Sequence, residues 1–187
     1  IVHFIGNYNW SNFSDVMNIG KHENEVIMLL SVSGEKMAYW QRMELSNGVV
    51  ENAFPTTIEL LRNMAKISVN NSSADAGNGT QYLTDLTFAI GDYMDYGTVA
   101  PFNTTNMNFE EGAVVESPYG TLCDAHESDL IPTGYGDSWG TPILCYERRN
   151  SVAHDPLYII VKGKYSTDAE YTYYKIDIVD QGEGELY

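Results

Sequence analysis

The chain has 187 residues, enough for one large domain or two small domains that each bury a core. Its 26 Asp and Glu residues outnumber 10 Lys and Arg, and the resulting net charge of −16 opposes binding to nucleic acid or to an anionic membrane. The 14 Tyr and 16 Gly residues, with only 19% charged residues, are typical of an all-β extracellular protein.

Five segments of the first part of the chain read as strands or short helices, and turn-rich sequences such as Ser46-Asn-Gly48 separate them. They are Ile1 to Ile5, Glu25 to Val32, Met37 to Leu45, Ile58 to Val69 and Tyr82 to Ile90. Their spacing favours a β-sandwich over alternating strands and helices. The polar sequence before Gly112 resembles an interdomain connection, so we expect domains at 1–112 and 113–187.

The strongest local signal is a β-hairpin near the C-terminus, formed by Leu157 to Tyr165 and Tyr171 to Ile178. Alternation predicts one buried face and one exposed face. The residues expected to be buried are Leu157, Ile159, Val161, Ile176 and Ile178. Lys162 and Lys164 are expected to be exposed.

Cys123 and Cys145 close a loop rich in Gly, Pro and Asp, and we favour a disulfide between them. Such a bond would contribute about 3 kcal/mol in the chain-entropy model. Two buried thiols are the alternative. A metal site beside Cys123 would recruit Asp124, His126, Glu127 and Asp129, but no second ligand motif completes it.

Signals for catalysis are weak. The four histidines, at positions 3, 22, 126 and 154, are scattered and read as surface or strand residues. The carboxylate-rich segments lie in Gly-rich sequence that is typical of solvated loops, and no Asp-x-Asp-x-Asp-Gly calcium loop is present. No nucleophile is matched with a base or a metal, so we expect neither an enzyme nor a cofactor.

The segment Gly134 to Gly140 reads as a surface loop. Tyr135, Asp137 and Trp139 within it offer flat faces and hydrogen-bonding groups, which suit recognition of a glycan or a partner protein. The two interpretations, an ordinary loop and a recognition loop, both remain open here.

Four stretches in order resemble the Bacteroidales type V fimbrial subunits, the fimbrillin-like family. They are Val2 to Asn7, Arg62 to Val69 (Arg-x-x-Ala-Lys-Ile-x-Val), Tyr96 to Pro101, and the hairpin Tyr158 to Asp177. The motif residues on the two strand-like stretches are Arg62, Ala65, Lys66, Ile67, Val69, Lys162, Gly163, Tyr165, Tyr174 and Lys175.

The resemblance implies two transthyretin-like β-sandwich domains in tandem and an exported lipoprotein of the outer membrane that assembles into a cell-surface fimbrium. Its partners would be other fimbrial subunits, which add a β-strand to one another, together with a host protein or glycan. We expect the leader, the first strands of the first domain and the last strands of the second to lie outside this chain. The groove for a partner strand is expected beside Ile1 to Ile5 or Ala65 to Val69.

A second hypothesis of a different class is a monomeric surface lipoprotein or a carbohydrate-binding β-sandwich module. In that case Trp10, Tyr135 or Trp139 would form the binding platform. No stretch of apolar residues is long enough to span a bilayer, and neither hypothesis calls for one.

Overall fold

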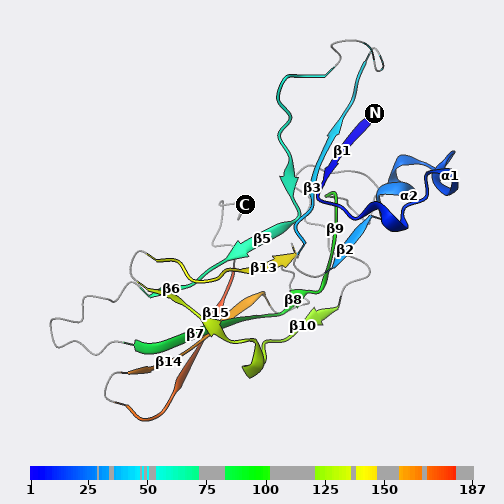
Figure 1. Ribbon diagram of the computed structural model, residues 1–187. Helices are drawn as coiled ribbons and strands as arrows, with labels where there is room; N and C mark the ends of the chain where they lie inside the picture. The colour runs from blue at the N-terminus through cyan, green and yellow to red at the C-terminus, as the bar shows by residue number, and fades with distance from the viewer. Residues whose placement is uncertain are drawn as a thin grey trace. The chain divides into compact units, whose positions relative to one another are not determined.

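The computed structural model describes residues 1–28, 30–33, 36–46, 48, 50, 54–71, 83–101, 121–135, 138–146, 156–165 and 168–179. Strands dominate these residues (Figure 1). Most of the described pairings are antiparallel, and β12 (Gly134–Tyr135) pairs with β6 (Asn70–Asn71) in parallel. The predicted all-β class is therefore confirmed.

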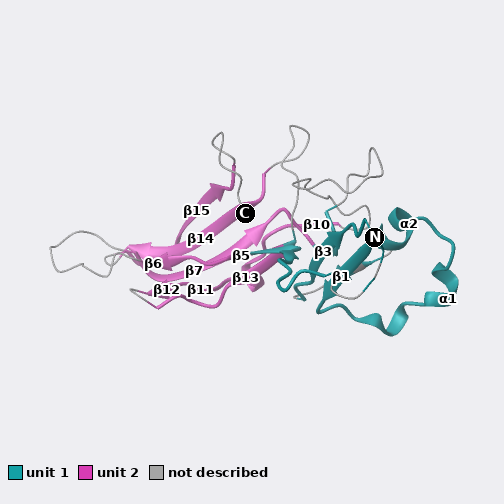
Figure 2. Cartoon of the chain, turned by 90° about the horizontal axis from the view of Figure 1, so that it is seen from above, with its two compact units in different colours: residues 1–65, 95–120, 146–149 teal, residues 66–94, 121–145, 150–187 magenta. Residues whose placement is uncertain are grey.

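The chain divides into two compact units, coloured in Figure 2, each built from discontinuous segments. Unit 1 comprises 1–65, 95–120 and 146–149, and unit 2 comprises 66–94, 121–145 and 150–187. These units do not coincide with the sequential domains 1–112 and 113–187. The expected junction near Gly112 lies outside the described residues, so a tandem arrangement of two sandwiches stays a prediction.

Unit 1 is built around a three-stranded antiparallel sheet in the order β1-β3-β4 and a two-stranded sheet of β2 and β9. The strands are β1 (Val2–Gly6), β2 (Ser31–Ser33), β3 (Tyr39–Met43), β4 (Leu61–Arg62) and β9 (Tyr96–Thr98). Every residue of β1 pairs with β3, from Val2 opposite Met43 to Gly6 opposite Tyr39. Three short helices lie between β1 and β2: η1 (Trp10–Asn12), α1 (Asp15–Asn18) and α2 (Glu23–Met28).

The core of unit 1 forms where α2 packs on the sheet. Its buried residues are Ile27, Leu30, Ala38, Trp40, Val99 and Ala100. The segment Glu25 to Val32 thus becomes the end of a helix followed by a strand, because the Glu25 carboxylate accepts the backbone N–H of His22 at 2.9 Å and helps to start α2. Ile27 then points inward as a helical residue.

The motif stretch Arg62 to Val69 is broken into two strands, β4 and β5 (Met64–Ile67), at Asn63. At this break the Asn63 side chain makes hydrogen bonds to the backbone of neighbouring segments. Its Oδ1 atom accepts the Ala38 N–H at 2.8 Å, and its Nδ2 atom donates to the Thr98 carbonyl at 3.1 Å. Met64 is buried, Ala65 and Lys66 are exposed, and Ile67 is half-buried, so burial along β5 does not follow a simple alternation.

Unit 2 contains the long strands β7 (Leu83–Gly91), β14 (Tyr158–Tyr165) and β15 (Thr172–Asp177), which with β11 (Ile131–Pro132) form a sheet in the order β11-β7-β14-β15. A second sheet has the order β10-β8-β13-β5, with β8 (Tyr93–Met94), β10 (Leu122–Cys123) and β13 (Ile143–Tyr146). A short 3₁₀ helix, η3 (Glu127–Asp129), precedes β11. Ile90, Cys145 and Leu157 form a buried cluster in this unit.

The predicted hairpin is present, with Tyr158 opposite Asp177 and Gly163 opposite Thr172. Leu157 and Val161 are buried as expected, and Ile159 and Ile178 are half-buried. Ile176 is wrongly predicted, because 51% of it is exposed on the outermost strand of the sheet. Lys162 and Lys164 are also less exposed than predicted, since tyrosine rings of the neighbouring strand lie beside their ammonium groups.

Gly163 of the family motif lies at a β-bulge between β14 and β7. Lys162 pairs with Thr87 and Lys164 with Thr84, so two residues of β7 oppose one glycine. Asp85, one of these two, has a φ of +52°, and a Cβ on Gly163 would lie 2.4 Å from the Leu86 Cδ2 atom. Close approach of the two strands therefore explains the glycine.

Candidate functional site

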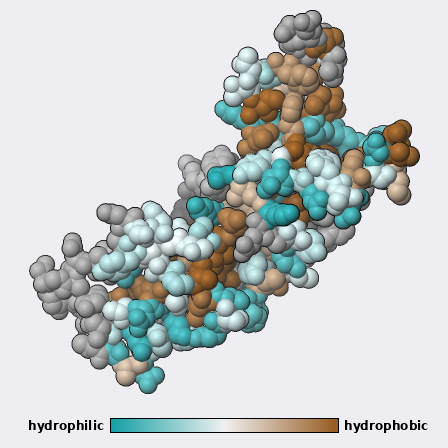
Figure 3. Space-filling view, viewed as in Figure 1, coloured by the Kyte–Doolittle hydropathy of each residue, from teal (hydrophilic) through white to brown (hydrophobic). Residues whose placement is uncertain are grey.

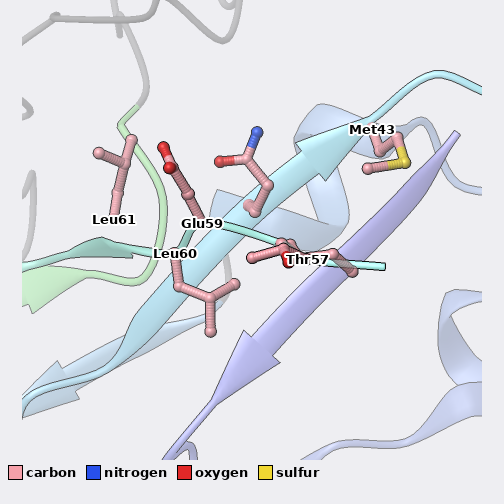
Figure 4. A pocket seen from close by; sticks show the side chains of 7 residues that line it. Met43, Thr57, Glu59, Leu60 and Leu61 are labelled. Carbon is pink, nitrogen blue, oxygen red and sulfur yellow. The ribbon is translucent and has the colours of Figure 1, made fainter. Parts of the chain in front are cut away.

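A cleft opens in unit 1 where β3 and the segment before β4 move apart. Tyr39 pairs with Arg62 and Trp40 with Leu61, and no described pairing joins the rest of β3 to the segment 57–60. The space between them measures about 330 Å³. The residues that line this β3 cleft are Gln41, Met43, Thr57, Ile58, Glu59, Leu60 and Leu61, and Figure 4 shows their side chains.

The lining of the β3 cleft mixes apolar and polar side chains and is open to solvent. Leu60 is 42% exposed and Leu61 is 45% exposed, although both are large aliphatic residues. On its far side β3 pairs with β1 along its whole length, so β1 is separated from the cleft by one strand. An extended peptide is the kind of occupant that suits a gap between two strand-like segments.

A polar network fixes the wall of unit 1 that faces α2. The His3 Nε2 atom lies 2.7 Å from a Glu23 carboxylate oxygen, and the same oxygen accepts from the Arg42 Nε atom at 2.6 Å. The indole N–H of Trp40 donates to the His3 Nδ1 atom at 3.1 Å, which leaves the ring proton on Nε2, facing Glu23. The network thus ties α2 to both β1 and β3.

This network also sets the protonation states of its members. Burial lowers the pKa of His3, and this effect exceeds the opposing influence of the Glu23 carboxylate. Burial raises the pKa of Glu23, but hydrogen bonds from Arg42 and His3 together bring it below its ordinary value. His3 reads as a surface or strand histidine in the sequence, because the spacing of positions 3, 23 and 42 follows no motif.

Several strands end their sheets among the described residues, and β1 and β15 are the longest of them. β1 is bonded to β3, and β15 is bonded to β14. A strand at the edge of a sheet is the kind of element that favours strand addition. Beside the edge of β15, Tyr173, Ile176 and Val179 are 52%, 51% and 45% exposed.

A second apolar surface lies on the segment that carries η1 and α1 in unit 1. We call it the α1 patch; its members are Trp10, Val16, Met17 and Ile19, which are 45%, 74%, 74% and 80% exposed. Brown surface is visible at the α1 end of the molecule in Figure 3. Its base is fixed by edge-to-face contacts of Trp10 with Tyr8 and Phe13. Several exposed apolar side chains on one short segment are typical of a surface that contacts a partner.

The predicted disulfide is wrong. The structure holds Cys123, on β10, and Cys145, on β13, as thiols. β8 lies between these two strands in the sheet order, and strands two places apart are about 9.6 Å from each other. A disulfide requires Cα atoms within about 7 Å. Burial raises the pKa of Cys145 to about 11.

The residues of the predicted recognition loop are only partly described. Tyr135 and Trp139 are 64% and 67% exposed, and the backbones of Tyr135 and Ser138 exchange hydrogen bonds of 2.8 and 3.0 Å. Asp137 lies outside the described residues. A recognition role for this loop stays a prediction.

The motif residues fall into two groups. Lys162, Gly163, Tyr165, Tyr174 and Lys175 lie together on the β14–β15 pair, where the hydroxyl groups of Tyr165 and Tyr174 are 2.8 Å apart. Arg62, Ala65 and Lys66 are exposed on β4 and β5, while Ile67 and Val69 are half-buried. In the described ranges, no group of three or more His, Cys, Asp or Glu residues is arranged to hold a metal, and no helix has the length and apolar character to cross a membrane.

Comparison with curated proteins finds two similar sequences, both described as the major fimbrium tip subunit FimE, one from Porphyromonas gingivalis strain ATCC 33277 and one from Porphyromonas gingivalis without a strain. Each is 29% identical to this chain over 96% of its length. The chain is similar to a Bacteroidales fimbrial subunit. The resemblance indicated by the four sequence motifs is thereby confirmed.

The chain spans about a third of the length of these relatives, since the similarity covers 32% of each. No family model matches the chain. No solved structure matches it either.

Proposed function

We propose that this chain is part of a structural subunit of a bacterial cell-surface fimbrium. The observation that carries the proposal is the similarity to a fimbrial tip subunit along 96% of the chain. Because a tip subunit is a structural component, the same similarity supports a role without catalysis. The subunit would be exported, anchored at the outer membrane as a lipoprotein, and placed at or near the end of the fimbrium.

Assembly would proceed by strand addition at the β3 cleft. A strand from a neighbouring subunit would lie between β3 and residues 57–60 and would bond to the backbone of residues 57–60. Its alternate apolar side chains would cover Met43, Leu60 and Leu61, and removal of apolar surface from water contributes about 25 cal/mol per Å². The groove predicted from the sequence borders Ile1 to Ile5 or Ala65 to Val69, and the β3 cleft lies one strand away from β1.

The edge strands β1 and β15 and the α1 patch support contacts with further subunits. An edge strand can form directional main-chain hydrogen bonds with a partner strand, whereas the α1 patch can bury apolar surface in a non-directional contact. A subunit within a fimbrium has neighbours on more than one side, so several separate contact surfaces suit this role.

The alternative function is that of a monomeric surface lipoprotein or carbohydrate-binding module. The exposure of Tyr135 and Trp139, at 64% and 67%, favours a binding loop in either case. Within the fimbrial proposal the same loop would contact a host protein or glycan. A binding loop is therefore compatible with both functions, and only incorporation of the chain into fimbriae distinguishes them.

Electron microscopy with gold-labelled antibodies against this chain, on the bacterium that encodes it, tests the proposal. We expect gold particles on surface fimbriae, concentrated near their ends. Gold confined to the cell body, with none on fimbriae, would instead support the monomeric surface protein.

A pair of substitutions tests the cleft. Leu60→Lys places a charge in the β3 cleft, and Leu122→Lys is its control, because the two leucines are 42% and 43% exposed and Leu122 lies on β10 of unit 2. We expect Leu60→Lys to remove this chain from fimbriae while the control is incorporated normally. Normal incorporation of both variants would contradict the cleft as acceptor.

A further inference from the structure

One face of the β14–β15 hairpin gathers tyrosines and lysines. Cross-strand pairing puts Lys162 opposite Tyr173 and Lys175 opposite Ile160, on the face away from Val161 and Phe88. We call it the Tyr–Lys face; its members are Tyr158, Lys162, Lys164, Tyr171, Tyr173 and Lys175. The fimbrial proposal assigns no role to this face.

The ammonium groups of the Tyr–Lys face lie over the rings. The Nζ atoms of Lys162 and Lys164 are 4.5 and 4.3 Å from the centre of the Tyr171 ring, and Lys175 is 4.4 Å from that of Tyr158. The rings nevertheless stay open to solvent, with Tyr171 43% and Tyr173 52% exposed. Tyr173 is the more open of the two, since its nearest lysine, Lys162, is 5.5 Å from its centre.

Glu127 of η3 holds this arrangement in place. Its carboxylate pairs with Lys162 and accepts the Tyr173 hydroxyl at 3.2 Å. The Tyr173 ring is therefore oriented before any ligand arrives, which reduces the entropy that binding costs. Lys164, in contrast, has no carboxylate within 4 Å among the described residues.

Charge makes the face unusual for this protein. It carries three lysines against the carboxylates of Glu127 and Asp177, whereas the whole chain has a net charge of −16. An anion is therefore attracted at this face by Lys164. A polyanion is repelled by the rest of the molecule, although salt confines that repulsion to a Debye length of about 8 Å.

We propose that the Tyr–Lys face binds a glycan that ends in a sugar with a single carboxylate. The C–H face of such a sugar would pack on the open ring of Tyr173, whose π-face is negative and attracts partly positive hydrogens. The carboxylate would accept a charge-assisted hydrogen bond from Lys164. An acidic peptide would satisfy Lys164 but would leave the flat ring of Tyr173 without a matching surface.

Sialyllactose is a suitable probe, and lactose is its neutral counterpart. We expect calorimetric titration to show binding of sialyllactose and binding of lactose about tenfold weaker or below detection, because one charge-assisted contact contributes on the order of 1.4 kcal/mol. The affinity should fall several-fold when salt is raised to about 0.5 M.

Two substitutions locate the site. Tyr173→Ser and Lys164→Gln should each weaken sialyllactose binding by about tenfold or more. Lys66→Gln, which removes the same charge from the exposed strand β5, and Tyr96→Ser, which removes an exposed tyrosine ring from unit 1, should leave it unchanged. Circular dichroism and melting temperature check that each variant is folded.

Several outcomes would overturn the proposal: no binding of sialyllactose, equal binding of lactose, unchanged binding by both Tyr173→Ser and Lys164→Gln, or tighter binding of an acidic peptide. Saturation-transfer NMR gives an independent readout, since contact with Tyr173 should place the strongest transfer on the acidic sugar. None of these outcomes bears on whether the chain is incorporated into fimbriae, so this proposal and the fimbrial role are tested separately.

Discussion

His3, Trp40, Glu23 and Arg42 show how single residues fix a wall of unit 1. Trp40 is only 5% exposed, and its indole N–H depends on His3 Nδ1 as acceptor. A proton on Nδ1 would replace that acceptor with a second donor, so protonation of His3 breaks a bond of the core residue. Nothing in the separations along the chain indicates that these residues meet.

Acid should destabilise unit 1 through this network. The pKa of His3 is lowered by burial, so the folded state binds fewer protons than the unfolded state, and stability falls as the pH decreases below the ordinary histidine value of about 6.5. The pKa of Glu23 is lowered by Arg42 and His3 against the effect of burial, so its contribution is present above about pH 4.5 and is lost as the pH falls further.

Melting temperatures between pH 8 and pH 4 measure this effect. His3→Gln should flatten the dependence near pH 6, whereas His22→Gln, an exposed residue outside the network, should leave it as in the wild type. An identical pH dependence in His3→Gln and wild type would show that His3 does not contribute.

The two thiols should differ in reactivity. Burial raises the pKa of Cys145 to about 11, so at pH 8 almost none of it is thiolate, and the surrounding core also blocks the reagent. Cys123 is only half-buried. We expect iodoacetamide to label Cys123 in the folded chain and to label Cys145 only after unfolding. Failure to label either cysteine without a reductant would mean that the two form a disulfide after all.

At the scale of elements, the alternation of apolar and polar residues predicts where strands form better than it predicts which of their residues are buried. Alternation along Leu157 to Tyr165 gives the hairpin and its register, because period two is visible in the sequence itself. Burial of Ile176 depends on what covers β15, and it lies on the last strand of the sheet. The break at Asn63 likewise depends on Ala38 and Thr98, which are distant in sequence.

The central and outer strands of this sheet should therefore differ in their contribution to stability. Phe88, on β7, is fully buried, whereas Ile176, on β15 of the same sheet, is 51% exposed. Phe88→Ala should lower the free energy of unfolding by about 3–5 kcal/mol. Ile176→Ala should lower it by less than about 1 kcal/mol. Urea titration measures both, and equal losses would mean that Ile176 is covered in solution.

At the scale of the whole molecule, sequence motifs indicated a fimbrial relative, but the candidate contact surfaces emerged only from the fold. The β3 cleft exists because two chain segments pair over two residues and then separate, and no spacing of residue types encodes that separation. The Tyr–Lys face needs both hairpin strands and Glu127 of η3. Sequence alone favoured a disulfide between Cys123 and Cys145. It does not reveal that β8 lies between the two strands that carry these cysteines.

The most direct test of strand addition compares amide hydrogen exchange in the isolated chain with exchange in assembled fimbriae. A partner strand in the β3 cleft should slow exchange of residues 57–60 by about tenfold or more, because their backbone groups would gain ladder bonds. The central strands β7 and β14, already paired in the isolated chain, serve as the reference. Equal exchange of residues 57–60 in the two states would contradict insertion of a partner strand at this cleft.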